Sequence, residues 1–418
     1  MAASPYFRIG WRNLSRNRRR TLITALGLAV GYFAVVFMVG WADGLTAEMI
    51  ENGTGIVTGQ LQAHAPDYLP ERRIYETIGG REGTDVETLV EAIAADPAIE
   101  AATPRVYAGG LVSSGESTTA GILMGMDPVR ESGVSRLMRG IVRGRAPEPG
   151  SNEILIGAEM SRQLEADVGD ELVLVVPAAD GSMGNDLYTV SGVFRSGMAE
   201  LDGAYALLPI TSLQTLAALP PGRIHEVAAS TTDAWLAPAA ADRLAEQLSA
   251  SLDVEVEAWN QLRPEMMDYV NLLQGWYIIV IVIVFSIAVF GVANTMLMAT
   301  YERRREFAVM LALGTTPSRV TLTVLVEALA LGILSLLVGA AITFPLLAWW
   351  TRSPPDLSWL YGDFTMFGAL IRPVLRVEWN TEWALWAGVA LLVTALLAAL
   401  YPAARAARVP PADTLSGD

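Results

Sequence analysis

The sequence of 418 residues contains neither lysine nor cysteine, and it has only two histidines. A Walker A phosphate loop requires a lysine that reaches the bound phosphates, so this chain cannot be a conventional ATPase by itself. Without cysteine it has no disulfide, no thiol nucleophile, no thiolate metal site and no cysteine for lipid attachment. His64 and His225 have no companions at ligand spacing, and each is predicted to be a surface or hydrogen-bonding histidine.

No catalytic pattern stands out among the remaining residues. The Gly-x-Ser-x-Gly elbow of α/β-hydrolases is absent, and acidic pairs such as Asp170-Glu171 have no histidine nearby. The acidic residues are therefore expected to form a solvated face. The sequence predicts a protein that is not an enzyme and holds no metal.

The composition indicates an integral membrane protein, with 52% hydrophobic residues and a mean hydropathy of +0.37. The net charge of -15 is unevenly distributed. The first twenty residues hold six arginines and no acid, whereas residues 43–274 hold 35 acids against 14 arginines. An acidic surface of that kind does not favour nucleic acid as a partner.

Four apolar runs are long enough to cross a bilayer. The first is longer than the apolar region of a signal peptide and is followed by no small-residue cleavage site, so we expect an uncleaved span. Arginine in the short connecting segments predicts that both termini are cytoplasmic. The expected organisation is an elbow (1–20), spans at 21–42, 271–300 (with a stalk), 320–350 and 382–401, an extracytoplasmic domain (43–270), a cytoplasmic coupling helix (301–319), an external loop (351–381) and a cytoplasmic tail (402–418).

The elbow has the pattern of a basic amphipathic helix. Phe7, Trp11 and Leu14 recur at helical spacing, and Arg12 and Arg16 belong to an adjacent basic stripe. Such a helix is suited to the headgroup region, with its apolar face toward the lipid. A retention signal that only fixes topology is the alternative interpretation.

The segment between the second and third runs is the most informative part of the chain. A charged group is followed by a short apolar helix that ends at Gly314, and Thr316-Pro317 then provides an N-cap and a proline at the first helical position. Phe307, Leu311 and Gly314 share one helical face. An ordinary positive-inside loop would explain the arginines but not the helix and its signals. The residues predicted to couple to a soluble partner are Glu302, Arg303, Arg304, Arg305, Glu306, Phe307, Met310, Leu311, Leu313 and Gly314.

These residues carry a family resemblance. Asn294-Thr-Met-Leu, followed by Glu302-Arg303-x-x-Glu306-Phe-Ala-x-Met-x-Ala-Leu-Gly314, resembles the signature of MacB/FtsX-like ABC-transporter permeases. In that family the segment forms the coupling helix that sits on the ATPase subunit. The chain's beginning and end also resemble the family pattern, and Gln60 to Tyr68 is similar to a segment of lipoprotein-releasing (LolC/LolE-like) permeases.

Two polar residues lie inside the predicted spans. Glu327 follows the coupling segment by about two turns, and an ionisable group in a span is a functional candidate. A structural role as partner of a cytoplasmic-side arginine is the favoured alternative, because the position lies near the interface. Asn294 is the second intramembrane polar residue, and Gly332 and Gly339 are expected to allow close helix packing.

The extracytoplasmic domain is predicted to be α+β, because short strand and helix patterns alternate along it. An inserted lobe is expected to begin in the glycine- and proline-rich stretch 140–150. A helix from 265 to 300 would be about 54 Å long, well beyond the ~30 Å hydrocarbon core, and is expected to form the stalk. The strands are expected at 56–65, 153–156, 172–176, 188–194, 205–208 and 254–256, and the helices at 85–95, 158–166, 211–219 and 237–252.

The resemblance implies a permease subunit that works by mechanotransmission in the bacterial inner membrane, with its large domain in the periplasm. It implies two copies of a separate ABC ATPase, which would bind ATP and Mg, with no cofactor in this chain, and a second copy of the chain or a homologous permease. We expect release of lipid-anchored protein from the outer leaflet. A MacB-like efflux permease, an FtsX-like activator of cell-wall hydrolases and a non-transporting sensor or scaffold are the alternatives.

Overall fold

The computed structural model of the chain divides into two compact units. The helical unit comprises residues 1–46, 270–361 and 373–418, and the external unit comprises residues 47–269 and 362–372. The predicted elbow residues Trp11, Arg12 and Arg16 lie outside the residues that the structure describes. Those described are 18–80, 85–115, 117–249, 253–357, 359–360, 364–366, 369–371 and 374–416.

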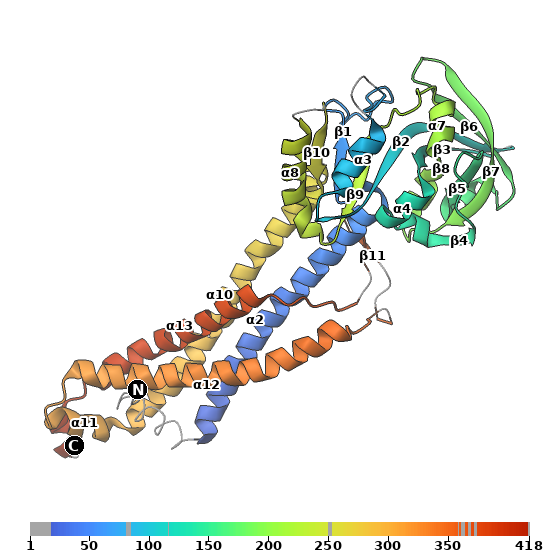
Figure 1. Cartoon of the computed structure of the whole chain (residues 1–418). Coiled ribbons are helices and arrows are strands. Elements are labelled where there is room, and N and C mark those ends of the chain that lie inside the picture. The colour runs from blue at the N-terminus through green and yellow to red at the C-terminus, as the bar shows by residue number, and fades with distance from the viewer. Residues whose placement is uncertain are drawn as a thin grey trace. The chain divides into compact units, whose positions relative to one another are not determined.

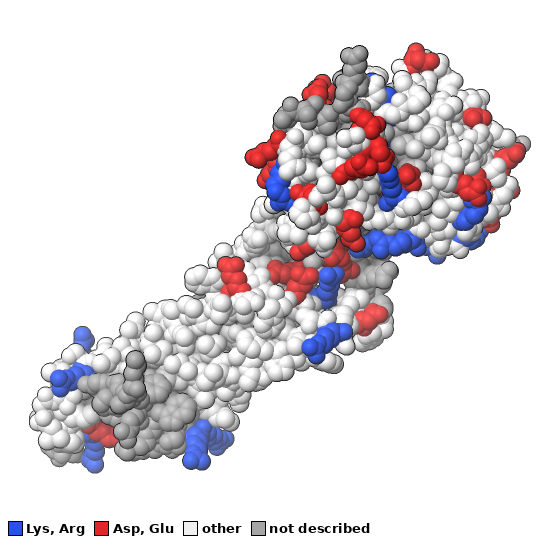
Figure 2. Space-filling view, viewed as in Figure 1, with Lys and Arg blue, Asp and Glu red and all other residues white. Residues whose placement is uncertain are grey.

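Among the described residues, four helices are long and apolar enough to cross a membrane, as the sequence predicts. They are α2 (Arg18–Gly53), α10 (Pro264–Glu302), α12 (Pro317–Arg352) and α13 (Thr381–Ala406). Figure 1 shows their coils running side by side, and Figure 2 shows that their long sides are nearly free of charged groups. The described part of the helical unit also contains the short helices α11 (Arg304–Ala312) and α14 (Pro411–Ser416).

Small residues let these helices approach closely. A Cβ atom on Gly339 would lie 3.1 Å from the Tyr32 ring, and one on Gly332 would lie 3.1 Å from the Cβ of Ala395. The expectation that both glycines serve helix packing is thus confirmed. The Tyr32 hydroxyl donates to the carbonyl of Ala384 at 3.2 Å, so α2 contacts both α12 and α13.

The end of α2 and the segment before α13 are joined by backbone contacts. The amide of Glu378 donates to the carbonyl of Gly40 at 2.8 Å. A Cβ atom on Gly40 would come within 2.6 Å of the Glu378 carbonyl oxygen, and one on Gly44 within 2.4 Å of the Arg376 carbonyl oxygen. Glycine is therefore required at both positions by the approach of the neighbouring chain.

The external unit is α+β and is built on one ten-stranded sheet. Its strand order is β10-β1-β9-β2-β3-β8-β5-β7-β4, and β6 pairs with β2 and β7. The pairings β3–β8 and β5–β7 are parallel, and the others are antiparallel. The strands are β1 (Leu61–His64), β2 (Ile99–Ser114), β3 (Ser117–Met126), β4 (Ile141–Gly144), β5 (Glu153–Gly157), β6 (Glu171–Pro177), β7 (Met183–Phe194), β8 (Tyr205–Pro209), β9 (Glu226–Thr231) and β10 (Glu255–Ala258).

Helices and turns of the external unit pack around this sheet (Figure 1). Figure 1 shows α3, α4 and α8 beside β1, β2, β9 and β10. The described elements of this unit outside the ten-stranded sheet begin with η1, which precedes β1. They are η1 (Thr54–Thr58), α3 (Val86–Ala94), α4 (Pro128–Val134), η2 (Leu137–Gly140), α5 (Ala158–Leu164), α6 (Ala199–Ala204), α7 (Ile210–Leu216), η3 (Ala234–Leu236), α8 (Ala237–Ser249), α9 (Trp259–Leu262), and a two-stranded sheet of β11 (Phe364–Met366) and β12 (Ala369–Ile371).

Two sequence predictions about this unit need correction. The expected strand 56–65 begins only at Leu61, because the preceding residues form the π-helix η1, which ends at Gly59 with a φ of 76°. The expected lobe after residue 140 is not separate, since β5, β6, β7 and β8 hydrogen bond within the same sheet as the earlier strands. The other predicted strands and helices are present with small shifts of their ends.

A buried ionic network fixes the middle of the external sheet. Arg105 on β2 donates from Nε and Nη2 to the two carboxylate oxygens of Glu131, at 3.0 and 2.6 Å. Its Nη1 lies 3.3 Å from Oε1 of Glu226 on β9 and also donates to the carbonyl of Val57. The Tyr107 hydroxyl donates to the same Glu226 oxygen at 2.9 Å. Side chains with no exposed area thus connect β2, β9, α4 and η1.

Candidate functional site

The charged segment between α10 and α12 folds into the helix that the sequence predicts. Gly314 ends it with a φ of 90°, in the left-handed region that favours glycine. The amide of Gly314 donates to the Leu311 carbonyl at 3.1 Å, and that of Thr315 to the Met310 carbonyl at 3.0 Å. These two bonds make a Schellman motif that closes α11. Pro317 occupies the first turn of α12, but the side chain of Thr316 makes no capping bond to that helix.

Arg303 is the centre of the segment. Its Nε donates to Oε2 of Glu306 at 2.9 Å, and its Nη1 donates to Oε2 of Glu327 on α12 at 2.8 Å. The guanidinium also lies over the ring of Phe307, 5.3 Å from its centroid. The Arg303 and Glu327 side chains are 16% and 10% exposed, so the pair is mostly sheltered. Arg303 therefore ties the start of α11 to α12.

One face of α11 is buried. Phe307 and Ala308 are 1% and 0% exposed and join the apolar core of the helical unit. Met310 and Leu311 are partly buried against the same core. The short helix α14 also contacts α11, a contact for which the sequence offers no signal. These residues position the helix and do not form its outer surface.

The opposite face of α11 is exposed and mixes charge with apolar area. Arg304 and Arg305 are exposed, Val309 is 43% exposed and Leu313 is 81% exposed. Arg305, Val309 and Leu313 follow each other at intervals of four and share one helical stripe. Sequence reasoning omitted Val309, although this spacing could have identified it. An exposed arginine–leucine stripe on a short helix can bind an apolar groove with an acidic rim.

The remaining predicted residues lie on α10 and α12. Glu302 ends α10 and accepts from Nη1 of Arg20 at 3.1 Å, which joins the start of α2 to the end of α10. Glu327 faces Arg303, as described above. Asn294 is exposed on α10, and its side chain has no hydrogen-bond partner within the described residues.

The two histidines lie in the external unit and are buried, not at the surface. They flank Tyr68, whose ring centroid is 5.9 Å from that of His64 and 5.4 Å from that of His225. His225 accepts from the Tyr107 amide at Nδ1 and lies 2.9 Å from the Ile74 carbonyl at Nε2. Desolvation lowers the pKa of His225 to about 4, so the ring is neutral at pH 7. Within the described residues, no cluster of three potential metal ligands occurs.

Known families match both parts of the chain. The family described as MacB-like periplasmic core domain matches residues 21–247, and the family described as FtsX-like permease C-terminal matches residues 278–411. The first match alone covers more than half of the chain. The residues matched by this family also agree with a large domain between the first two spans.

Individual proteins are similar over nearly the full length. The lipoprotein-releasing system transmembrane protein LolE of Haemophilus influenzae is 24% identical, with 99% of both chains covered. LolC of Xylella fastidiosa is 24% identical, with 97% of both covered. The macrolide export ATP-binding/permease protein MacB of Escherichia coli is 24% identical, with 98% of this chain but 60% of MacB covered. Two family matches, four spans and full-length relatives agree: this chain is a multi-pass membrane protein that belongs to the MacB/FtsX-like permease family of ABC transporters.

Proposed function

We propose that this permease is the membrane subunit of a lipoprotein-releasing transporter in the bacterial inner membrane. The observation that carries the proposal is the similarity to LolE over 99% of both chains, whereas the match to MacB covers 60% of that protein. The substrate would be a lipid-anchored protein in the outer leaflet. Its acyl chains would enter between the first and second spans, where burial of apolar surface favours lipid without selecting one chain.

ATP hydrolysis would be supplied by a separate ABC ATPase, in two copies. The sequence contains no lysine for a phosphate loop, so ATP and Mg would be bound by the partner and not by this chain. The stripe Arg305, Val309 and Leu313 supports α11 as its docking surface. Arg303 would transmit movement of α11 to α12 through its ion pair with Glu327.

The partner in the membrane would be a second copy or a homologous permease, packed on α10. In the most apolar stretch of α10 only 17% of the residues are buried, against 44% in α2 and α13. The exposed amide of Asn294 on the same helix supports protein rather than lipid as its neighbour, because an amide in hydrocarbon requires a hydrogen-bond partner.

Movement would be transmitted along the two longest helical connections. α2 has 36 residues and α10 has 39, which correspond to about 54 and 58 Å at a rise of 1.5 Å per residue. Both exceed the ~30 Å hydrocarbon core, and both are continuous through their apolar stretches. Mechanotransmission would use these helices without moving the substrate across the inner membrane.

The proposal is tested by purifying the full chain from its native membrane and identifying the proteins that accompany it. The variant Leu313→Asp places a charge on the exposed stripe and is expected to remove the ATPase subunit and its activity. Leu187→Asp, which alters an exposed leucine on β7 (44% exposed, against 81% for Leu313), is the control and is expected to retain both. Retention of the ATPase by Leu313→Asp would contradict α11 as the docking site.

The accompanying proteins also separate the alternatives. Lipid-anchored proteins enriched in the absence of ATP and released when it is added would support lipoprotein release. A periplasmic adaptor together with a small amphiphile would instead support an efflux permease like MacB. If no ATPase accompanies the wild-type chain, the sensor or scaffold interpretation replaces the transporter.

A further inference from the structure

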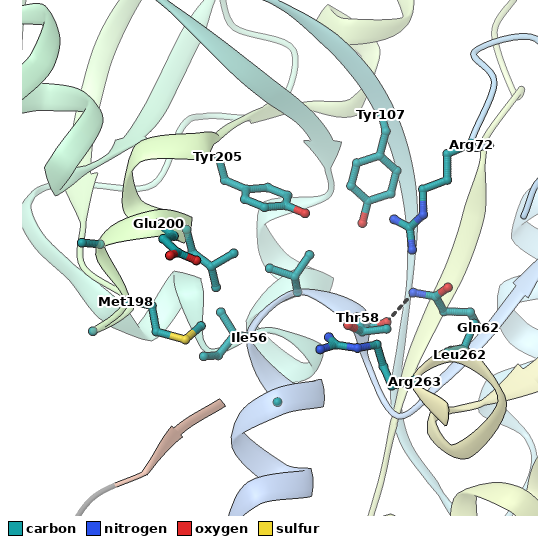
Figure 3. A pocket seen from close by; sticks show the side chains of 15 residues that line it. Ile56, Thr58, Gln62, Arg72, Tyr107, Met198, Glu200, Tyr205, Leu262 and Arg263 are labelled. Atoms are coloured by element: carbon teal, nitrogen blue, oxygen red, sulfur yellow. Dashed lines mark hydrogen bonds between the residues drawn. The ribbon is translucent and has the colours of Figure 1, made fainter. Parts of the chain in front are cut away.

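The external unit contains a cavity of about 590 Å³ that the coupling mechanism does not use. It lies among η1, β1, β2, α6 and the segment that follows α9, all of which belong to this one unit. Its volume is within the range of about 300 to 1,000 Å³ that is typical of small-molecule sites. Figure 3 shows its side chains arranged around an open centre.

One end of the cavity is cationic. Arg72 and Arg263 line it together with Thr58 and Gln62, and Figure 3 shows both guanidinium groups on this side. The Gln62 amide donates to the Thr58 carbonyl at 2.7 Å, and its side-chain oxygen is buried without a hydrogen-bond partner among the described residues. A guanidinium is the side chain best suited to a carboxylate or phosphate, because its donors form a planar fork.

Arg72 has two features that distinguish it from a structural arginine. Its side chain is exposed and forms no hydrogen bond or ion pair with any described residue, although the charge of Glu226 raises its pKa, whereas Arg263 is held by Glu265. Its backbone has a φ of 49°, in the left-handed region that a residue with a side chain rarely adopts. Strained backbone of this kind is concentrated at binding sites, where the surrounding structure holds it in place.

The other end of the cavity is largely apolar. Ile56, Met198 and Leu201 line it together with Glu200, and Figure 3 shows Ile56, Met198 and Glu200 across the cavity from Arg72. The hydroxyl groups of Tyr107 and Tyr205 point into the space between the two ends (Figure 3). The cavity thus offers separate surfaces to a charged head and to a short hydrocarbon chain.

The charge of this cavity is opposite to that of its surroundings. Two arginines and one glutamate, Glu200, line it, which gives a formal charge of +1. The sequence from 43 to 274 carries 35 acids and 14 arginines, a balance of -21. Glu265 pairs with Arg263 and Glu226 acts on Arg72, so an anion meets less repulsion here than on the rest of this acidic domain, and no strong net attraction.

We propose that the cavity is a binding site for a small amphiphile with one anionic head, a carboxylate or a phosphate, and a short apolar chain. Arg72 and Arg263 bind the head, the Tyr205 hydroxyl donates to it, and the chain lies against Met198 and Leu201. The site belongs to the external unit alone and does not rest on the identity of the transported substrate. The alternative role for Arg72 is to balance the buried charge of Glu226, which raises its pKa against the effect of burial.

The test uses the full chain in lipid nanodiscs and isothermal titration calorimetry, with empty nanodiscs subtracted. The probes are hexyl phosphate, hexanoate, inorganic phosphate and hexyl glucoside. Hexyl phosphate and hexanoate are expected to bind at least tenfold more tightly than inorganic phosphate, and hexyl glucoside is expected not to bind. Equal binding of inorganic phosphate and hexyl phosphate would show that the site does not recognise an apolar chain. Binding of hexyl glucoside would show that it does not require an anionic head. Either result would overturn the proposal.

Variants separate binding from folding. Arg72→Asn removes the cation with a residue that tolerates positive φ, and it is expected to weaken hexyl phosphate at least tenfold without lowering the unfolding temperature. Arg73→Asn changes the adjacent exposed arginine, which does not line the cavity, and is expected to bind as the wild type does. Leu201→Gln is expected to weaken hexyl phosphate but not inorganic phosphate.

Two outcomes for these variants would contradict the site. Unchanged binding by Arg72→Asn, with a lower unfolding temperature, would assign that arginine to charge balance. Equal losses of hexyl phosphate binding in Arg72→Asn and Arg73→Asn would show that binding depends only on the overall surface charge and not on this cavity. Co-purification of an ATPase is expected to be the same in all three variants, so failure here is distinguishable from failure of the transporter proposal.

Discussion

Each unit of this protein has an arginine that holds two carboxylates, and the two clusters differ in their access to water. In the external unit Arg105, Glu131 and Glu226 have no exposed side-chain area. In the helical unit Arg303 is 16% exposed and its partner Glu327 is 10% exposed. The first cluster joins strands and helices of one sheet. The second joins the exposed helix α11 to a membrane span.

The difference indicates different roles. Charges without access to water cannot separate without leaving an unpaired ion in a medium of low dielectric, so the external cluster is fixed once the domain folds. Charges near the surface can be re-solvated at lower cost and can therefore change partners. Arg303 also contacts Glu306, whose side chain is 40% exposed. This arrangement is consistent with an ion pair that changes partners during a transport cycle.

The largest expected effect is on the fully buried cluster. Arg105→Met leaves two buried carboxylates without the cation they share and is expected to lower the free energy of unfolding by about 4 kcal/mol. Chemical denaturation of the full chain, followed by tryptophan fluorescence, measures this loss. Arg162→Met removes an arginine whose side chain is 77% exposed and should change little. Similar losses in the two variants would remove the basis of the comparison.

The second effect is a pH dependence next to the same cluster. Burial lowers the pKa of His225 to about 4, below its ordinary 6.5, so the unfolded chain binds more protons between these values. This contribution to stability is fully present above pH 6.5 and is lost as the pH falls toward 4, by about 3 kcal/mol in total. His225→Gln keeps a donor and an acceptor and should flatten the dependence. An unchanged slope between pH 6.5 and 4.5 would contradict the assignment.

The third effect concerns the half-sheltered cluster. Glu327→Ala removes one charged hydrogen bond from Arg303, which keeps Glu306, and is expected to cost about 2 kcal/mol. It should also uncouple ATP hydrolysis in the assembled complex, with the ATPase still bound. Thermal unfolding and ATPase assays of the same preparation separate the two. A loss as large as that of Arg105→Met would show that both clusters are equally fixed.

The smallest effect is expected at the exposed end of the same cluster. Glu306→Gln removes a charge that is 40% exposed, and solvent screening leaves roughly 0.5 kcal/mol or less. Unfolding in low and high salt measures the contribution. Glu327→Gln under the same conditions is the sheltered counterpart, and its loss should be larger and less dependent on salt. Equal salt dependence in the two variants would contradict a difference in solvent exposure between Glu306 and Glu327.

Features that depend on local sequence were predictable. Long apolar runs specified the four spans, because a single segment can pair its own backbone N–H and C=O groups within hydrocarbon only as a helix. Gly314 and Pro317 marked the end of one helix and the start of the next, since each acts through its own backbone. The prediction extended to α11 and to the face that Phe307 shares with Leu311, but not to which face is buried and which is exposed.

Features that depend on distant neighbours were not predictable. The long strand β2 escaped detection because Pro104 and Gly109-Gly110 weaken its pattern, and pairing with β3, β6 and β9 overrides that preference. Likewise, nothing in the spacing of Glu131 and Glu226, which lie 26 and 121 residues from Arg105, indicates that they share it.

The sequence by itself therefore determined the spans, the short helix between the second and third of them, and the lack of a Walker A lysine in this chain, since these follow from hydropathy, local backbone preference and composition. Only the tertiary structure decided which arginines are buried, which face of α11 is open and that Arg72 lines a cavity. Burial is a property of the neighbours that the fold brings to a residue, and those neighbours lie far away along the chain.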